Sequence, residues 1–175
     1  VLFVAPADAT EALQNYMALA MEFDDVTFAH TTTDALKAGL ELQNDYALIV
    51  FRDFDEGRKV LGSDTVLSTE SLKGFFEGVR FPTVMNFDQK AAEKIFGSQS
   101  SAMFYFTDDA SDSGLAAFRE FAKANKGSVL FSHSTVTADL GARLAEYVGV
   151  TTADAPCLRL VNLVNGELHK YTLGS

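Results

Sequence analysis

The chain is poor in cysteine, because Cys157 is the only one among its 175 residues. A single cysteine can form no intramolecular disulfide, no C-x-x-C redox pair and no cysteine cluster for zinc. Tryptophan is absent as well. No uncharged apolar run approaches the roughly 18 residues that a membrane-spanning helix requires. The sequence therefore predicts no thiol exchange within this chain, no cysteine zinc site and no transmembrane segment.

Basic residues are also scarce, with 14 Lys and Arg against 24 Asp and Glu, which gives a formal net charge of -10 and a pI near 4.6. Such a chain is repelled by the phosphate backbone of nucleic acids and by anionic lipid surfaces. We therefore expect neither nucleic acid nor membrane as a partner. Hydrophobic residues make up 47% of the chain, enough for a packed core and too much for a disordered tail.

Catalytic motifs are missing. There is no Gly-rich phosphate loop, no G-x-S-x-G elbow and no H-E-x-x-H, and the three histidines never fall at metal-ligand spacing. Asp108, Asp109 and Asp112 only partly resemble a calcium loop, so we interpret them as capping residues for free backbone N–H groups. Cys157 follows Pro156 at the start of an apolar strand, where a lone thiol is usually a small buried hydrophobe. The sequence predicts no catalytic residue, no metal site and no cofactor.

Apolar residues alternate between strand-like and helix-like spacing, which is typical of an α/β protein with a mixed sheet. Ser68 is the predicted N-cap of one helix, with Glu70 in its first turn. Four apolar stripes at helical spacing are expected to face a core: Leu13, Tyr16, Met17 and Ala20; Leu72, Phe75, Phe76 and Val79; Leu115, Phe118, Phe121 and Ala122; Leu140, Leu144, Tyr147 and Val148.

A weak internal repeat divides the chain. The segment ending at His30 resembles the one ending at His133, an offset of 103, and a hairpin with Gly57 in its turn recurs with Gly166, an offset of 109. The first copy lacks an opening strand and helix, and the second lacks a closing helix. We therefore predict two tandem α/β domains, residues 1–80 and 81–175, each clipped at one end. Because the chain begins at Val1 without Met, we expect it to be a piece of a longer protein.

Several apolar residues of the second copy could form an exposed surface rather than core. They end its first strand, share faces of two helices or flank the turn at Gly166: Phe87, Ala92, Phe96, Leu144, Tyr147, Leu163 and Leu168. If that turn projects toward the two helices, the set makes an apolar surface too large for a monomer to leave without a partner.

The order of short motifs through both copies resembles the b and b′ domains of the protein disulfide isomerase family. The motifs include Phe28-Ala29-His30-Thr31 and Val50-Phe51-Arg52 in the first copy, and the runs at residues 81–87, 94–97 and 155–160 in the second. The resemblance implies two thioredoxin-like domains, with a cis bond between Ala155 and Pro156. It also implies that C-x-x-C centres belong to flanking a and a′ domains, because the matching positions here, residues 5–8 and 107–110, hold no cysteine.

The resemblance further implies a function. In this family the b′ domain supplies the main pocket for client proteins, and its matched positions are the seven residues named above. The implied partners are unfolded or partly folded polypeptides and the flanking catalytic domains, and the implied compartment is the lumen of the endoplasmic reticulum. Two alternatives remain open: an acidic calcium-buffering protein with calsequestrin-like thioredoxin domains, and a structural spacer that binds no client.

Overall fold

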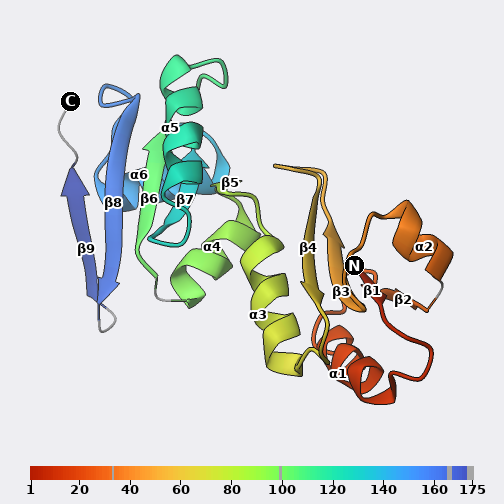
Figure 1. The fold of residues 1–175 in the computed structure, drawn as a ribbon. Coiled ribbons are helices and arrows are strands. Elements are labelled where there is room, and N and C mark those ends of the chain that lie inside the picture. Colours follow the sequence, from red (N-terminus) through yellow and green to blue (C-terminus); the bar gives the residue numbers. More distant parts are fainter. Residues whose placement is uncertain (33, 99, 165–166, 173–175) are drawn as a thin grey trace. The chain divides into compact units, whose positions relative to one another are not determined.

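The computed structural model of the chain contains two compact units, unit 1 (Val1–Pro82) and unit 2 (Thr83–Ser175). It describes residues 1–32, 34–98, 100–164 and 167–172 (Figure 1). Each unit has one sheet with helices on its faces, so the α/β class with mixed sheets is as predicted.

Unit 1 is built on a four-stranded sheet in the order β2-β1-β3-β4. Its elements are β1 (Leu2–Val4), α1 (Thr10–Ala20), β2 (Ala29–Thr31), α2 (Asp34–Gly39), β3 (Tyr46–Phe51), β4 (Arg58–Ser63) and α3 (Thr69–Val79). β1 runs parallel to β2 and antiparallel to β3, and β3 and β4 form the predicted hairpin.

The two faces of the unit 1 sheet follow from the alternation of side chains along a strand. Phe3 and Leu48 face α1 and α3, where they join one core cluster with Tyr16 and Phe76. Val4 and Ile49 belong to a second cluster on the opposite face. Each face of the sheet therefore carries its own apolar cluster, and loops follow at the ends of the strands.

The buried stripe of α1 differs from the predicted one. Ala12, Tyr16 and Leu19 are buried, whereas Met17 is 48% exposed. This helix is apolar around much of its circumference, so spacing alone allows several stripes. The packing of Tyr16 on Phe3, with ring centroids 4.9 Å apart, selects the one observed.

The start of α3 is as predicted. The Ser68 hydroxyl accepts the backbone N–H of Ser71 at 3.2 Å, which satisfies one of the free donors of the first turn. Leu72 and Phe76 of this helix are buried.

Unit 2 has a five-stranded sheet in the order β5-β7-β6-β8-β9. Its elements are β5 (Val84–Asn86), α4 (Gln89–Gly97), β6 (Ala102–Phe106), α5 (Ser113–Ala124), β7 (Leu130–Ser134), α6 (Asp139–Val148), β8 (Cys157–Val164) and β9 (Glu167–Thr172). The bond between Ala155 and Pro156 is cis, which confirms the expectation from the resemblance.

One predicted core residue of α5 lies at the surface instead. Leu115, Phe118 and Ala122 are buried, whereas Phe121 is 49% exposed. Phe121 stands at the margin of the buried stripe and meets only the edge of the Phe131 ring, at 6.0 Å between centroids. The expectation that Phe121 is a core residue is therefore wrong.

The internal repeat is visible in the strand register. Phe3 lies opposite His30 and Leu48 in unit 1, and Tyr105 lies opposite His133 and Leu158 in unit 2. Position 5 is therefore equivalent to position 107, and the loops that follow β1 and β6 can be compared residue by residue.

Candidate functional site

Two of the predicted client-binding residues, Phe87 and Phe96, lie on the face of the unit 2 sheet opposite α5. Tyr105 of β6 stacks on Phe118 of α5, with ring centroids 5.5 Å apart. Its neighbour Phe104 therefore points to the other face, where its ring meets that of Phe87 at 5.7 Å. In Figure 1, α5 lies in front of this sheet and α6 lies behind it.

Two of the predicted residues, Phe87 and Phe96, are brought together. Phe87 directly follows β5, and its backbone N–H donates to the carbonyl of His133 at 2.8 Å, which holds it beside β7. Phe96 comes from α4, whose N-cap Asp88 accepts the N–H of Ala91 at 2.8 Å. The two rings meet edge to face at 6.3 Å, a favourable geometry for aromatic pairs. Both residues stay only half-buried, so this pair forms part of the surface.

Ala92 lies one helical turn before Phe96 and is also half-buried. The intervening residues Ala91 and Ile95 are buried and anchor α4 to the unit. α4 therefore turns one side inward and leaves Ala92 and Phe96 at the margin of the same surface.

The two predicted residues of α6 have different surroundings. Leu144 is only 4% exposed and belongs to the buried side of the helix with Ala145 and Val148. Tyr147 is 56% exposed. Lys170 of β9 lies over the Tyr147 ring at 4.9 Å, and its Nζ donates to the Tyr147 carbonyl. Tyr147 thus offers an aromatic face to solvent, whereas Leu144 offers almost no surface.

The last two predicted residues, Leu163 and Leu168, lie opposite each other in the pairing of β8 with β9. Their side chains lie outside the described residues. The structure thus brings Phe87 and Phe96 into contact, with Ala92 beside them on α4. The exposed ring of Tyr147 contacts Lys170 of β9, which lies at the opposite edge of the sheet from β5.

The acidic residues after β6 act as caps, as predicted. Asp112 is the N-cap of α5 and accepts the N–H of Gly114 at 2.8 Å and the hydroxyl of Tyr105 at 2.7 Å. The hydrogen bond from Tyr105 has the largest effect and, together with that from Gly114, lowers the pKa of Asp112. Asp108 accepts the N–H groups of Val136 and Thr137, at 2.8 and 3.3 Å. Among the described residues, no three His, Cys, Asp or Glu side chains form a group that could hold a metal ion.

The single thiol is poorly suited to nucleophilic chemistry. Cys157 is half-buried, and this burial raises its pKa above the ordinary value. Because the thiolate is the reactive form, a raised pKa leaves little of it at neutral pH.

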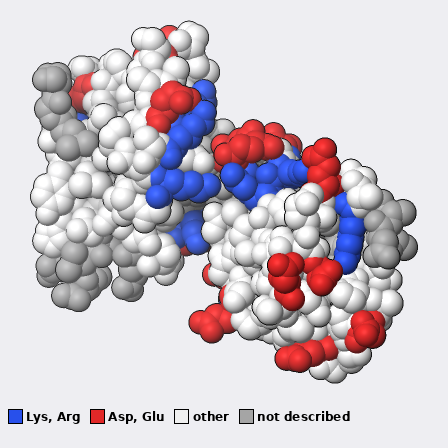
Figure 2. Space-filling model, viewed as in Figure 1, with Lys and Arg blue, Asp and Glu red and all other residues white. Residues whose placement is uncertain are grey.

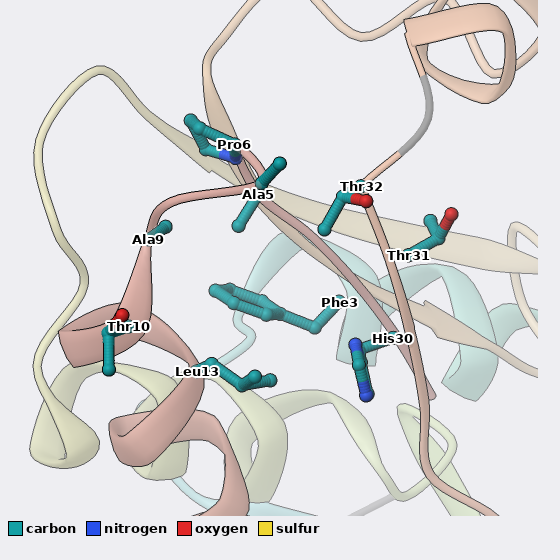
Figure 3. Close-up of a pocket in the computed structure, with 10 residues that line it drawn as sticks. Phe3, Ala5, Pro6, Ala9, Thr10, Leu13, His30, Thr31 and Thr32 are labelled. Carbon is teal, nitrogen blue, oxygen red and sulfur yellow. The ribbon is translucent and has the colours of Figure 1, made fainter.

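Unit 1 holds a cavity that the sequence analysis missed. Its volume is about 270 Å³, and it lies beyond the carboxyl ends of β1 and β2, beside the start of α1 (Figure 3). We call it the unit 1 recess; it is lined by Phe3, Ala5, Pro6, Ala7, Ala9, Thr10, Leu13, His30, Thr31 and Thr32. Figure 3 shows the Phe3 ring above Leu13, with His30 to its lower right and Ala5 and Pro6 of the loop above it. The one sequence signal was the run of small side chains from Ala5 to Ala9, where few atoms can fill the space between strand ends and helix.

Comparison with known proteins gives consistent results. A sequence model of the family described as thioredoxin-like domain matches residues 6–173. The chain is 26% identical over 166 residues to rabbit (Oryctolagus cuniculus) protein disulfide-isomerase, covering 93% of this chain and 32% of that protein. It is 31% identical over 159 residues to human protein disulfide-isomerase A2, covering 87% and 30%. It thus spans about a third of the length of these relatives.

Solved structures show the same fold. The crystal structure of the bb fragment of ERp72 superposes with a TM-score of 0.64 over 99% of this chain and 80% of that fragment, at 14% identity. The zinc-bound form of human ERp44 gives 0.62 over 99% of this chain and 46% of that protein, at 16% identity. The predicted thioredoxin-like fold is therefore confirmed. None of the helices in the described part of the chain combines the length and apolar character needed to cross a bilayer.

Proposed function

This chain belongs to the thioredoxin-like domain family, as a member of the protein disulfide isomerases, and from that premise we propose that it is a non-catalytic, client-binding region of such an enzyme. Unfolded polypeptide binds the apolar surface of unit 2 around Phe87, Phe96 and Tyr147. Flanking catalytic domains of the parent protein exchange the disulfides, and the whole works in the lumen of the endoplasmic reticulum. With Cys157 as its only cysteine, the chain has no C-x-x-C pair of its own.

The observation that carries this proposal is the partly buried aromatic pair at the surface. Phe87 and Phe96 come from two different elements, meet edge to face and still keep part of their surface in contact with solvent. Aromatic side chains bury much area at a low cost in conformational entropy, which is why they are frequent at binding surfaces. The exposed ring of Tyr147 adds a further apolar contact with a polar end.

Burial of apolar surface supplies the affinity. A client that covers about 400 Å² of apolar surface gains on the order of 10 kcal/mol at about 25 cal/mol per Å². Most of that gain is offset by the ordering of the client and by association entropy. The net affinity is weak, which suits a region that must hold many different chains briefly and release them.

The test substitutes residues of this surface and measures the binding of a short unfolded peptide. Phe96→Asp places a charge beside Phe87 and is expected to weaken binding about ten-fold or more, the effect of losing a central aromatic contact. Tyr147→Asp changes a side chain that is already exposed and should weaken binding less. The peptide carries one Trp, and its fluorescence reports burial without background because the chain has no Trp.

Phe121→Asp is the matched control. Phe121 is likewise a Phe on a helix of unit 2, more exposed than Phe96 at 49%, but it lies on the opposite side of the sheet, on α5. Circular dichroism checks that all three variants stay folded, and Tyr147→Asp keeps the test usable if Phe96→Asp unfolds. Unchanged affinity in both Phe96→Asp and Tyr147→Asp, or an equal loss in Phe121→Asp, contradicts the assigned surface. A chain that binds no unfolded peptide at all is better explained as a spacer.

A further inference from the structure

The unit 1 recess lies in the most acidic part of the chain. Unit 1 holds 14 acidic and six basic residues, a formal charge of -8, whereas unit 2 holds ten acidic and eight basic residues, a charge of -2. The first basic residue is Lys37, and residues 1–36 contain six Asp and Glu. Figure 2 shows acidic side chains at several places on unit 1. All residues that line the recess fall between positions 3 and 32, within this stretch without Lys or Arg.

Most residues that line the recess are apolar, and two acidic residues are direct sequence neighbours of lining residues. Phe3, itself 1% exposed, lines the recess together with Leu13 of α1, and the small residues Ala5 and Ala9 line it above the ring (Figure 3). Asp8 lies between two lining residues of the loop, and Glu11 lies in the first turn of α1 directly after the lining residue Thr10. Both are exposed and neither lines the recess itself, but each is bonded to a lining residue and therefore adds negative charge near the recess.

The loop after β1 in unit 1 differs from the equivalent loop after β6 in unit 2. Ala5 is equivalent to Thr107, because the N–H of each donates to the strand beside it, to Thr31 in unit 1 and to Ser134 in unit 2. Pro6 is therefore equivalent to Asp108, whose carboxylate joins the loop after β6 to the loop after β7. Pro6 has no side-chain acceptor, so unit 1 cannot form this link.

We propose that the unit 1 recess is a second peptide-binding site, which takes one apolar side chain of a polypeptide whose neighbouring residues are Lys or Arg. A cavity of about 270 Å³ is slightly smaller than the ~300–1,000 Å³ of pockets for drug-sized ligands, and it suits a single large side chain. Charge complementarity selects the flanking residues, because Asp8 and Glu11 attract cations, residues 1–36 hold no Lys or Arg, and unit 1 carries a formal charge of -8. This site is independent of the surface proposed on unit 2.

The first test uses the unsubstituted chain and two probes. One is a short peptide of Gly and Lys with a single central Trp, and the other has Glu in place of every Lys. The chain contains no Trp, so the blue shift of the probe's fluorescence reports its burial directly. The Lys probe is expected to bind at least ten-fold more tightly than the Glu probe at low salt, and this difference should shrink at high salt because exposed charges are screened.

The second test fills the recess or removes its charges. Ala9→Leu and Thr10→Tyr place bulk at two lining positions and should weaken the Lys probe at least ten-fold. Asp8→Asn combined with Glu11→Gln should weaken it about three-fold, the effect expected for exposed charge pairs. Glu70→Gln is the matched control, since Glu70 is an exposed residue in the first turn of α3 in the same unit, and it should leave affinity unchanged.

The outcomes separate the two binding sites. The inference holds if the recess variants lose the Lys probe while Phe96→Asp binds it normally. It is overturned if the Lys probe does not bind, if Lys and Glu probes bind equally, or if folded Ala9→Leu and Thr10→Tyr variants both bind normally. Loss of the Lys probe in Phe96→Asp alone would assign it to unit 2, which overturns the recess site and leaves the proposed function in place.

Discussion

Gly141 sits in the first turn of α6, where this helix passes the end of β7 without room for a side chain. A Cβ at this position would lie 2.7 Å from the backbone carbonyl oxygen of Thr135 and 3.0 Å from the Ser134 hydroxyl, and closer still to the Thr135 hydroxyl. The Thr135 hydroxyl is itself held by a 3.0 Å hydrogen bond to the carbonyl of Ala138. Because a backbone oxygen cannot rotate away, Gly141→Ala must push α6 off the strand end.

The magnitude follows from two opposing effects. Overpacking of a buried site costs about 1–3 kcal/mol. Replacing Gly by Ala in a helix returns about 1 kcal/mol. Because the clash at Gly141 involves a backbone oxygen, its cost lies in the upper part of that range, at about 2–3 kcal/mol, and we expect Gly141→Ala to lower the free energy of unfolding of unit 2 by about 1–2 kcal/mol. Gly74 of α3 is the control, because a Cβ there meets no atom within 4 Å. Gly74→Ala should stabilise unit 1 by about 0.5–1 kcal/mol through helix propensity alone.

Hydrogen exchange measured by mass spectrometry resolves the two units separately, which a single melting curve does not. Core amides of β6 and β7 should exchange about ten-fold faster in Gly141→Ala, and those of unit 1 several-fold slower in Gly74→Ala. If Gly141→Ala leaves the exchange of unit 2 unchanged or slower, the close approach of α6 to β7 is not as described. If Gly74→Ala destabilises unit 1, the conclusion that Gly74 has free space for a Cβ is wrong.

Two further predictions concern the hydroxyl groups of two buried tyrosines and the carboxylate that caps α5. Burial raises the pKa of Tyr16 to about 12, although a hydrogen bond to the carbonyl of Ala29 partly offsets it. Burial also raises the pKa of Tyr105 to about 12, and the hydrogen bond to Asp112 reinforces this shift. A raised pKa favours the neutral form in the folded state, so this stabilisation is complete below pH 10 and is lost as pH rises toward 12. In an ultraviolet titration, Tyr16→Phe and Tyr105→Phe should each remove one phenol that ionises late. Loss of an earlier-ionising phenol in either variant would contradict the burial of that hydroxyl. Asp112→Ala removes both the cap of α5 and the acceptor for the Tyr105 hydroxyl, so it should destabilise unit 2 by about 2–3 kcal/mol, measured by hydrogen exchange. Asp112→Asn keeps a side-chain acceptor and should cost less than about 1 kcal/mol. Equal losses in both variants would show that capping is not the role of Asp112.

Much of the fold could be predicted from local patterns. Strand and helix spacing indicated the α/β class, and His30 and His133, which define the first repeat offset, pair with equivalent strand residues, Phe3 and Tyr105. Ser68 and Asp112 were identifiable as caps because an N-cap bonds to groups only two or three residues away. The absence of a redox pair needed no structure at all.

The candidate site was less predictable. The seven proposed residues were chosen as apolar positions at suitable spacing, and spacing cannot tell which of two neighbouring apolar residues on a helix is covered. Leu144 turned out buried and Tyr147 exposed, three positions apart on α6. Phe118 and Phe121 divide in the same way on α5.

The sequence by itself determined the alternation of elements, the two-fold repetition, the helix caps and the lack of a C-x-x-C pair, because each of these depends on residue type or on neighbours a few positions away. Only the tertiary structure decided which rings stay at the surface, that Phe87 meets Phe96, and that Asp108 reaches the backbone of Val136 across 28 residues. It also decided that a cavity lies above Phe3 in unit 1. Exposure and close contact depend on segments distant in the chain, and no local pattern specifies which of them will meet.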